Sequence, residues 1–193
     1  MKRMRAILCG VLAALMLAGC GSGAGVDLTR YAVKEAAYPA YPAAPDYDSY
    51  CDRTGTLDWD AYSTALEKYQ REMQILGKGD RPDDGAVRRF ADRTVGKIFT
   101  GGENTVYSPI SLYVALGMLT ELTDGQTKQQ VMDLLGAADA GALRQQIKKL
   151  WVSVYQDGDA VCRLANAAFL REDADVKQSA TDTLAEWYYA SSY

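Results

Sequence analysis

Few side chains in this 193-residue chain have the types and spacing that enzymatic chemistry requires. The sequence holds no histidine, 25 acidic residues, 21 basic residues and 4 cysteines. Without an imidazole the chain cannot build a Ser-His-Asp or Cys-His nucleophile, and histidine-based zinc motifs are excluded as well. Closely spaced carboxylates lie near turns or helix starts, where they cap the backbone: Asp58/Asp60, Asp157/Asp159 and Asp173/Asp175. We expect no enzyme activity, metal site or cofactor.

The sequence predicts that Cys20 is a site of lipid attachment. Residues 1–19 combine basic residues, a 13-residue apolar run from Ala6 to Ala18 and small residues before the cysteine, as in a signal peptide. The run is too short to span a bilayer, which needs about 20 apolar residues. Leu17-Ala18-Gly19-Cys20 resembles the bacterial lipobox, whose cysteine becomes the lipidated first residue of the mature protein. An ordinary cleaved signal with an incidental cysteine is the alternative.

The expected location and partners follow from this processing. Removal of residues 1–19 takes away three of the 21 basic residues and none of the 25 acidic ones, which leaves a net charge of −7. An acidic surface repels phosphate backbones, so nucleic acid is not an expected partner. We expect the secreted protein on the extracellular face of a bacterial membrane, held by acyl chains on Cys20. There, Cys51 and Cys162 could form a disulfide, with two separate thiols as the alternative.

The mature chain is predicted to start with a tether and a spacer over residues 20–57. Glycine and serine at 21–25 predict flexibility, and the Tyr/Pro-rich stretch 38–45 predicts an extended spacer, with a Pro-rich recognition peptide as the alternative. Residues 58–82 form an extra helix and linker. Apolar residues at steps of three and four predict a helix over 58–76, which glycines and a proline then end.

Residues 83–193 carry the periodicity of a packed α+β domain. Ser108 followed by Pro109 is typical of a helix start. The helix that follows is apolar on nearly every side, so we expect it to be buried all round at the centre of a core. The predicted elements are helices over 84–99, 109–122, 127–135, 140–155 and 177–190 and a strand over 161–170.

Four motifs within this domain carry a family resemblance. They are Asn104-Thr-Val-Tyr-Ser-Pro-Ile-Ser-Leu112, Asp124-Gly-Gln-Thr-Lys-Gln-Gln130, Leu164-Ala-Asn-Ala-Ala-Phe169 and Leu184-Ala-Glu-Trp-Tyr-Tyr-Ala190. In this order they resemble the start of helix B, the turn into helix C, a strand of the large central sheet and the end of the following helix in serpins. The resemblance implies serpin-like N-terminal helices A–E with the first strand of the central sheet.

The resemblance also implies a serine protease inhibitor, whose partner is a serine or cysteine protease. In that family the protease cleaves an exposed reactive loop and forms an acyl-enzyme, and the loop then inserts into the central sheet. By the same resemblance, Ser108, Ser111 and Asn166 take shutter-like structural positions where that sheet opens. The alternatives are a plain N-cap, a helix-surface serine and an ordinary buried hydrogen bond.

The extent of the resemblance limits what these residues are expected to do. It begins at about Asp84, and the reactive-centre loop of a complete serpin lies beyond Tyr193. We therefore expect an incomplete domain, truncated before that loop and inactive alone. The alternative function is a non-enzymatic binding module on a surface lipoprotein, because the tether, the spacer and the aromatic helix 58–76 lie outside the resemblance.

Overall fold

The computed structural model describes residues 27–79, 82, 84–102, 104–158 and 160–193, so the predicted signal peptide and Cys20 lie outside the described residues. The chain forms two units, Met1–Tyr31 and Ala32–Tyr193. The described part of the first unit contains the 3-10 helix η1 (Thr29–Tyr31). There the carboxylate of Asp27 accepts hydrogen bonds from the Thr29 backbone N–H at 3.0 Å and from its hydroxyl at 2.6 Å.

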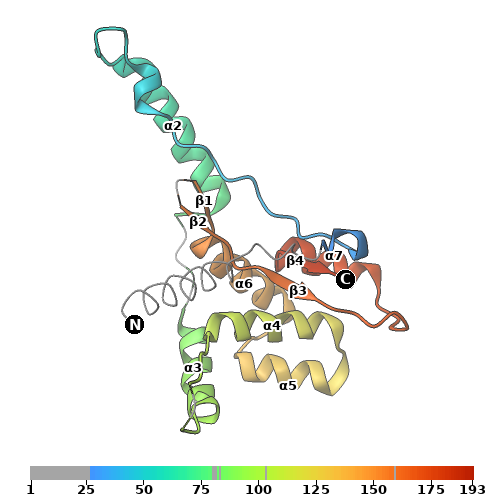
Figure 1. The fold of residues 1–193 in the computed structure, drawn as a ribbon. Coiled ribbons are helices and arrows are strands. Elements are labelled where there is room, and N and C mark those ends of the chain that lie inside the picture. Colours follow the sequence, from blue (N-terminus) through green and yellow to red (C-terminus); the bar gives the residue numbers. More distant parts are fainter. Residues whose placement is uncertain (1–26, 80–81, 83, 103, 159) are drawn as a thin grey trace, which may run out of the picture. The chain divides into compact units, whose positions relative to one another are not determined.

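The described part of the second unit is mostly helical with short strands, which confirms the α+β class (Figure 1). Acidic or hydroxyl side chains start several of its helices: those of Asp58, Ser108 and Asp139 each accept a first-turn N–H. In chain order the elements are η2 (Tyr47–Tyr50), α2 (Trp59–Leu76), α3 (Gly85–Ile98), α4 (Pro109–Leu122), α5 (Gly125–Leu135), α6 (Ala140–Val154), β1 (Gln156–Asp157), β2 (Val161–Cys162), β3 (Asn166–Ala168), α7 (Gln178–Trp187) and β4 (Ala190–Ser192).

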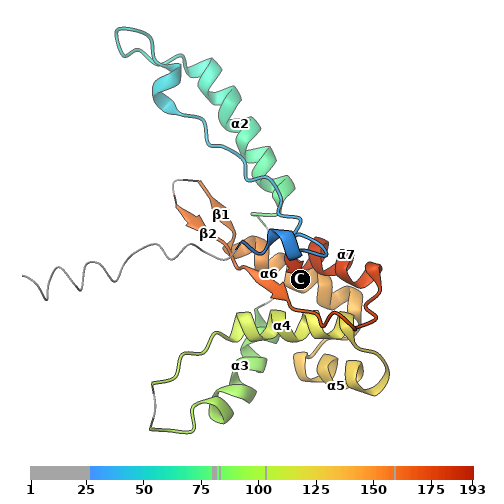
Figure 2. The same ribbon diagram turned by 45° about the vertical axis from the view of Figure 1, so that its right-hand side comes forward.

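Helix α4 is the centre of the main core. Figures 1 and 2 show α5 along one side of α4, and α6 with the strands β3 and β4 on the other. Val114 on α4 is fully buried, as are Ile147 on α6 and Leu184 on α7, and Phe90 on α3 is 1% exposed. Burial of such side chains is the main favourable term in folding, so α4 holds the domain together.

The prediction that α4 is buried all round is wrong. Ala115 is exposed and Leu119 keeps 38% of its side-chain surface exposed. The two residues are four positions apart, so they lie on one strip of α4, whereas the other residues of the helix are buried or partly buried. An apolar helix surface is therefore left open to solvent.

The end of the chain differs from its predicted form in two places. The strand predicted over 161–170 is split into β2, which pairs antiparallel with β1, and β3, which pairs parallel with β4. The last helix stops at Trp187, before its predicted end at 190. Tyr189 turns the chain there with a φ of 48°, in the left-handed region that non-glycine residues rarely adopt, and β4 follows. The sheet of β3 and β4 therefore has one more strand than the sequence predicts.

Residues before α2 contact the domain. Lys34 pairs antiparallel with Ser192 of β4. Farther along, the chain runs beside α2 (Figure 2). The rings of Tyr47 and Tyr50 each make an edge contact with Tyr62 of that helix. Part of the region that the sequence predicts to be a spacer therefore packs against the rest of the second unit.

Candidate functional site

The parallel pair β3–β4 holds the first of the predicted site residues, Asn166. Asn166 lies opposite Ala190, and Ala168 lies opposite Ser192. The side-chain amide of Asn166 donates a hydrogen bond of 3.0 Å to the carbonyl of Tyr188. It thereby ties β3 to the turn between α7 and β4, which is the role of an ordinary part-buried hydrogen bond.

The two predicted serines lie together at the start of α4. The hydroxyl oxygens of Ser108 and Ser111 are 2.9 Å apart, and Ser108 Oγ accepts the Ser111 backbone N–H at 3.3 Å. Ser108 is the N-cap and Pro109 the first helical residue, as the sequence predicts. The structure joins the serines to each other, whereas Asn166 is bonded to other groups. The shutter-like role of the three residues stays a prediction.

The two cysteines within the second unit are separate. Cys51 is a half-buried thiol beside η2, and Cys162 is an exposed thiol in β2. The structure therefore contains no disulfide between them, and the alternative of two thiols describes it. The proposed lipid site Cys20 lies outside the described residues.

A buried polar network, absent from the sequence predictions, connects α4, α6 and the end of α7. The Glu121 side chain is 4% exposed, and its carboxylate receives two hydrogen bonds from the Arg144 guanidinium, at 2.8 and 2.6 Å. The Tyr188 hydroxyl donates a third bond of 2.8 Å to Glu121. Glu121 is the single charged residue of α4, and a lone carboxylate in an apolar helix is a sequence signal for a buried partner.

The pKa values in this network follow from burial and pairing. Burial alone raises the pKa of Glu121, but the hydrogen bonds from Arg144 and Tyr188 outweigh it and hold that pKa below its ordinary value. Burial, together with the adjacent Glu121 carboxylate, raises the pKa of Tyr188 far above its ordinary value. Glu121 is therefore charged and Tyr188 neutral near neutral pH, which suits the hydrogen bond that Tyr188 donates to Glu121.

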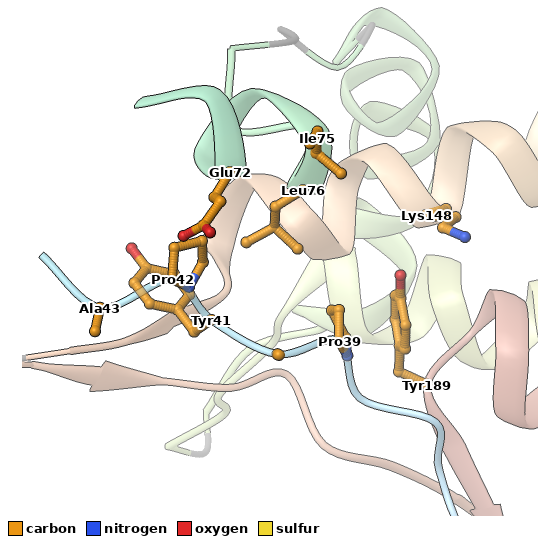
Figure 3. Close-up of a pocket in the computed structure, with 10 residues that line it drawn as sticks. Pro39, Tyr41, Pro42, Ala43, Glu72, Ile75, Leu76, Lys148 and Tyr189 are labelled. Carbon is orange, nitrogen blue, oxygen red and sulfur yellow. The ribbon is translucent and has the colours of Figure 1, made fainter. Parts of the chain in front are cut away.

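An open cavity of about 580 Å³ lies where the segment before α2 meets the C-terminal end of α2 (Figure 3). Pro39 and Tyr41 form one wall, and Leu76 faces them from α2. The charged groups on its lining are Glu72, which pairs with Lys68 at 3.8 Å, and Lys148, which lies 4.9 Å from the centre of the Trp187 ring. Such a lining offers apolar contact but no adjacent nucleophile and base.

The described residues contain no cluster of three or more acidic or cysteine side chains that could hold a metal ion. Within the same part of the chain, no helix has the length and hydropathy to cross a bilayer. Among the described residues, the candidates for a functional role are the sheet of β3 and β4, the helix α4 packed beside it and the exposed surfaces around them.

Comparison with known proteins gives two matches. The family model described as "Serpin (serine protease inhibitor)" matches residues 86–193. Serpin-Z3 of Arabidopsis thaliana is 23% identical to this chain over 116 residues, which are 60% of this chain and 30% of that protein. The family match includes α4 and the β3–β4 sheet and leaves α2 outside. The chain thus spans less than a third of that relative's length.

Proposed function

This chain belongs to the serpin family, and we propose that it is the N-terminal part of a serine protease inhibitor held outside the cell by lipid on Cys20. The observation that carries the inhibitor proposal is the family match over residues 86–193. That region contains the parallel pair β3–β4 with α4 packed beside it. In this family the central sheet receives the cleaved reactive loop. We therefore propose that β3 and β4 belong to the sheet into which the loop would insert.

The chemistry of inhibition is supplied by the protease. The nucleophile of the protease attacks the reactive loop, and the resulting acyl-enzyme is trapped when the loop enters the sheet. An inhibitor of this kind needs no catalytic group of its own, which fits a chain that has no histidine. We therefore propose a binding and trapping function without enzyme activity.

Residues 1–193 alone are proposed to leave proteases uninhibited. The matched segment corresponds to 30% of the length of Serpin-Z3, and the described sheet that would receive a loop has two strands. Apolar surface on α4 and directly after β3 stays uncovered: Leu119 is 38% exposed and Phe169 73%. These surfaces are the places where the rest of an inhibitory domain would pack.

The test is expression of residues 1–193 together with the coding sequence that follows them in the genome. We expect the longer protein to form an adduct with chymotrypsin or subtilisin that survives boiling in SDS, and residues 1–193 to form none. A protease whose catalytic serine is replaced by alanine is the control, because it cannot form the ester bond. The inhibitor proposal fails if the longer protein forms no adduct with any serine or cysteine protease tested and lowers the activity of none.

Lipid attachment has its own test and a matched control within the chain. Cys9 and Cys20 both lie in the N-terminal segment, but only Cys20 follows the lipobox pattern. Cells fed a radioactive fatty acid should label the unchanged protein and the Cys9→Ser variant, and both should enter the detergent phase on phase separation. Cys20→Ser should lose the label. Label retained in Cys20→Ser would show that the acyl chain is carried elsewhere.

The second candidate function is a non-enzymatic binding module, and the observation that favours it is α2. This helix lies outside the family match and has no buried residue. Its Trp59 and Ile75 are 63% and 86% exposed. A purified protein of residues 20–193 that is soluble and melts cooperatively supports this function, whereas a molten or aggregating one supports the incomplete inhibitor.

A further inference from the structure

The two edges of β4 make hydrogen bonds to different partners. On the inner edge, the Tyr193 N–H that follows β4 donates to the Ala168 carbonyl of β3 at 2.9 Å. On the outer edge, Ser192 pairs with residues 33–41, which we call the strap. The Ser192 N–H donates to the Lys34 carbonyl at 2.7 Å, and the Ser192 carbonyl accepts the Val33 N–H at 2.8 Å. Both backbone groups of Ser192 are therefore bonded to the strap.

The strap also satisfies polar groups on α7. The Ala37 N–H donates a bond of 3.1 Å to the carbonyl of Ala185, which lies in the last turn of α7, where carbonyls have no partner within the helix. The Lys34 ammonium lies 2.6 Å from Oδ1 of Asp182. That oxygen is buried and has no hydrogen-bond partner among the described residues, so Lys34 supplies its compensating charge.

Aromatic contacts fix the second half of the strap. The Tyr38 ring stacks on Trp151 at a centroid distance of 5.6 Å, and Tyr41 makes an edge contact with Tyr155 at 5.4 Å. The Tyr155 hydroxyl donates a bond of 3.1 Å to the Pro39 carbonyl. Figure 3 shows Pro39 and Tyr41 on the strap beside the end of α2. Trp151 is fully buried, so these contacts extend the core onto the strap.

We propose that the strap covers the outer edge of β4 at Ser192, through the Lys34–Ser192 bridge and the bonds beside it, and thereby prevents a second copy of this chain from pairing there. An edge strand with free N–H and C=O groups is a template for another strand, and identical chains are its most abundant competitors. The strap itself is a poor template. It carries the charged residues Lys34 and Glu35 and ends in a stretch with Pro39, and charges and prolines are the residues that protect sheet edges.

This inference rests on contacts within residues 32–193 and is independent of protease inhibition. It depends on the strap's N–H donors, so proline substitution tests it, because proline removes the donor and preserves an extended backbone. The test variant is Val33→Pro/Ala37→Pro, which removes the Val33 N–H that donates to Ser192 and the Ala37 N–H that donates to Ala185. The backbone bonds between Lys34 and Ser192 must then hold the strap without these two neighbours. The matched control is Glu35→Pro, because the exposed Glu35 donates no backbone hydrogen bond to any described residue.

The first readout is amide hydrogen exchange at two neighbouring residues in dilute protein. Loss of the strap should speed exchange of the Ser192 N–H by about tenfold or more. The Tyr193 N–H should keep its rate, because β3 protects it from the other side. Unchanged exchange at Ser192 would overturn the proposal. Equal acceleration at both residues would also overturn it, because β4 itself would then have opened.

The second readout is self-association. The test variant should form dimers or larger assemblies at lower protein concentration than Glu35→Pro does, as measured by light scattering after size exclusion. Ser192 should regain protection as the concentration of the test variant rises, because a second chain then covers the edge. A test variant that associates no more than the control, or whose Ser192 stays unprotected in the assemblies, contradicts the assigned role.

Discussion

At the scale of single residues, Glu121 is a buried charged side chain whose partners affect the stability of the domain. Its carboxylate is almost fully buried, and its charge is compensated by the Arg144 guanidinium and the Tyr188 hydroxyl. Replacing a whole buried ion pair by apolar groups is often neutral, but removing one partner leaves an uncompensated charge. Glu121 therefore makes the domain dependent on a contact between α4 and α6.

Arg144→Leu is predicted to destabilise the domain by about 2 to 4 kcal/mol, because it leaves the Glu121 carboxylate buried without a counter-charge. Urea denaturation measures the change. Lys149→Leu is the control: it removes a charge from an exposed position of the same helix and should change stability by less than about 0.5 kcal/mol. If the two variants lose the same stability, the Glu121–Arg144 pair has no special role.

The lowered pKa of Glu121 also predicts a dependence on pH. A carboxyl whose pKa is lower in the folded state contributes stability above its unfolded value, here 4.5, and loses that contribution as pH falls through the folded pKa. The difference in unfolding free energy between the unchanged protein and Glu121→Gln should therefore shrink as pH falls below 4.5. A difference that widens in acid would mean that the folded state binds the proton more tightly.

At the scale of elements, the packing of α4 on α6 depends on one glycine. Gly117 lies in the middle of α4, and a methyl group built there would overlap Cδ1 of Ile147 and lie 3.1 Å from a ring carbon of Tyr188. Ile147 and Tyr188 are both fully buried and have little room to move. The glycine thus allows a close approach of the helices at the expense of helix propensity.

Gly117→Ala should destabilise the domain by about 1 to 2 kcal/mol, because the overlap outweighs the gain in helix propensity of about 1 kcal/mol. In an Ile147→Val background the overlapping Cδ1 is absent, so the same substitution should cost less or even stabilise. Thermal or urea unfolding of the four proteins in this double-mutant cycle measures the coupling. Equal effects of Gly117→Ala in both backgrounds would contradict the close packing of these helices.

Helix positions could be predicted well from the sequence, because caps and apolar periodicity are local signals. Ser108 and Pro109 mark the start of α4, and Gly77 and Gly136 follow the last residues of α2 and α5 with positive φ values of 89° and 69°. Strand β4 could not be predicted. Its residues Ala190–Ser192 are small and have weak strand propensity, so the pairing with β3 comes from tertiary contacts.

The candidate site was predictable only where its residues belong to family motifs. Ser108, Ser111 and Asn166 were found in this way. The pairing of Glu121 with Arg144 joins residues 23 positions apart, and that of Lys34 with Asp182 joins the two ends of the second unit. A lone carboxylate such as Glu121 in an apolar helix signals that a partner exists, but the sequence does not identify which distant residue it is, because neither lies on the helical repeat of the other.

At the scale of the whole molecule, the second unit has a buried core but also leaves several large apolar side chains exposed to solvent. Val106 is 99% exposed, and Phe169 is 73% exposed although it stacks on Tyr193. Val106 lies between α3 and α4, and Phe169 follows β3. Isolated exposed apolar residues are common, whereas a large exposed apolar patch marks an interaction surface. The match to Serpin-Z3 covers 30% of that protein.

Val106→Ser/Phe169→Ser should therefore improve solubility and reduce binding of the dye ANS, with a melting temperature within about 3 °C of the unchanged protein. The comparison is Phe90→Ser, which places a hydroxyl at a position 1% exposed and should lower the melting temperature strongly. If the double substitution lowers the melting temperature as much as Phe90→Ser does, the exposed side chains belong to the core.

The strap precedes β4 in the sequence, so the ribosome synthesises it first. Ala36 of the strap bonds the side chain of Ser191, and 155 positions separate the two residues. A ribosome adds about 5 to 20 residues per second, so β4 emerges roughly 8 to 30 seconds after the strap. The strap is therefore synthesised before the β4 edge that it covers. Because both belong to one molecule, the strap competes at a high effective concentration with neighbouring nascent chains on the same messenger RNA.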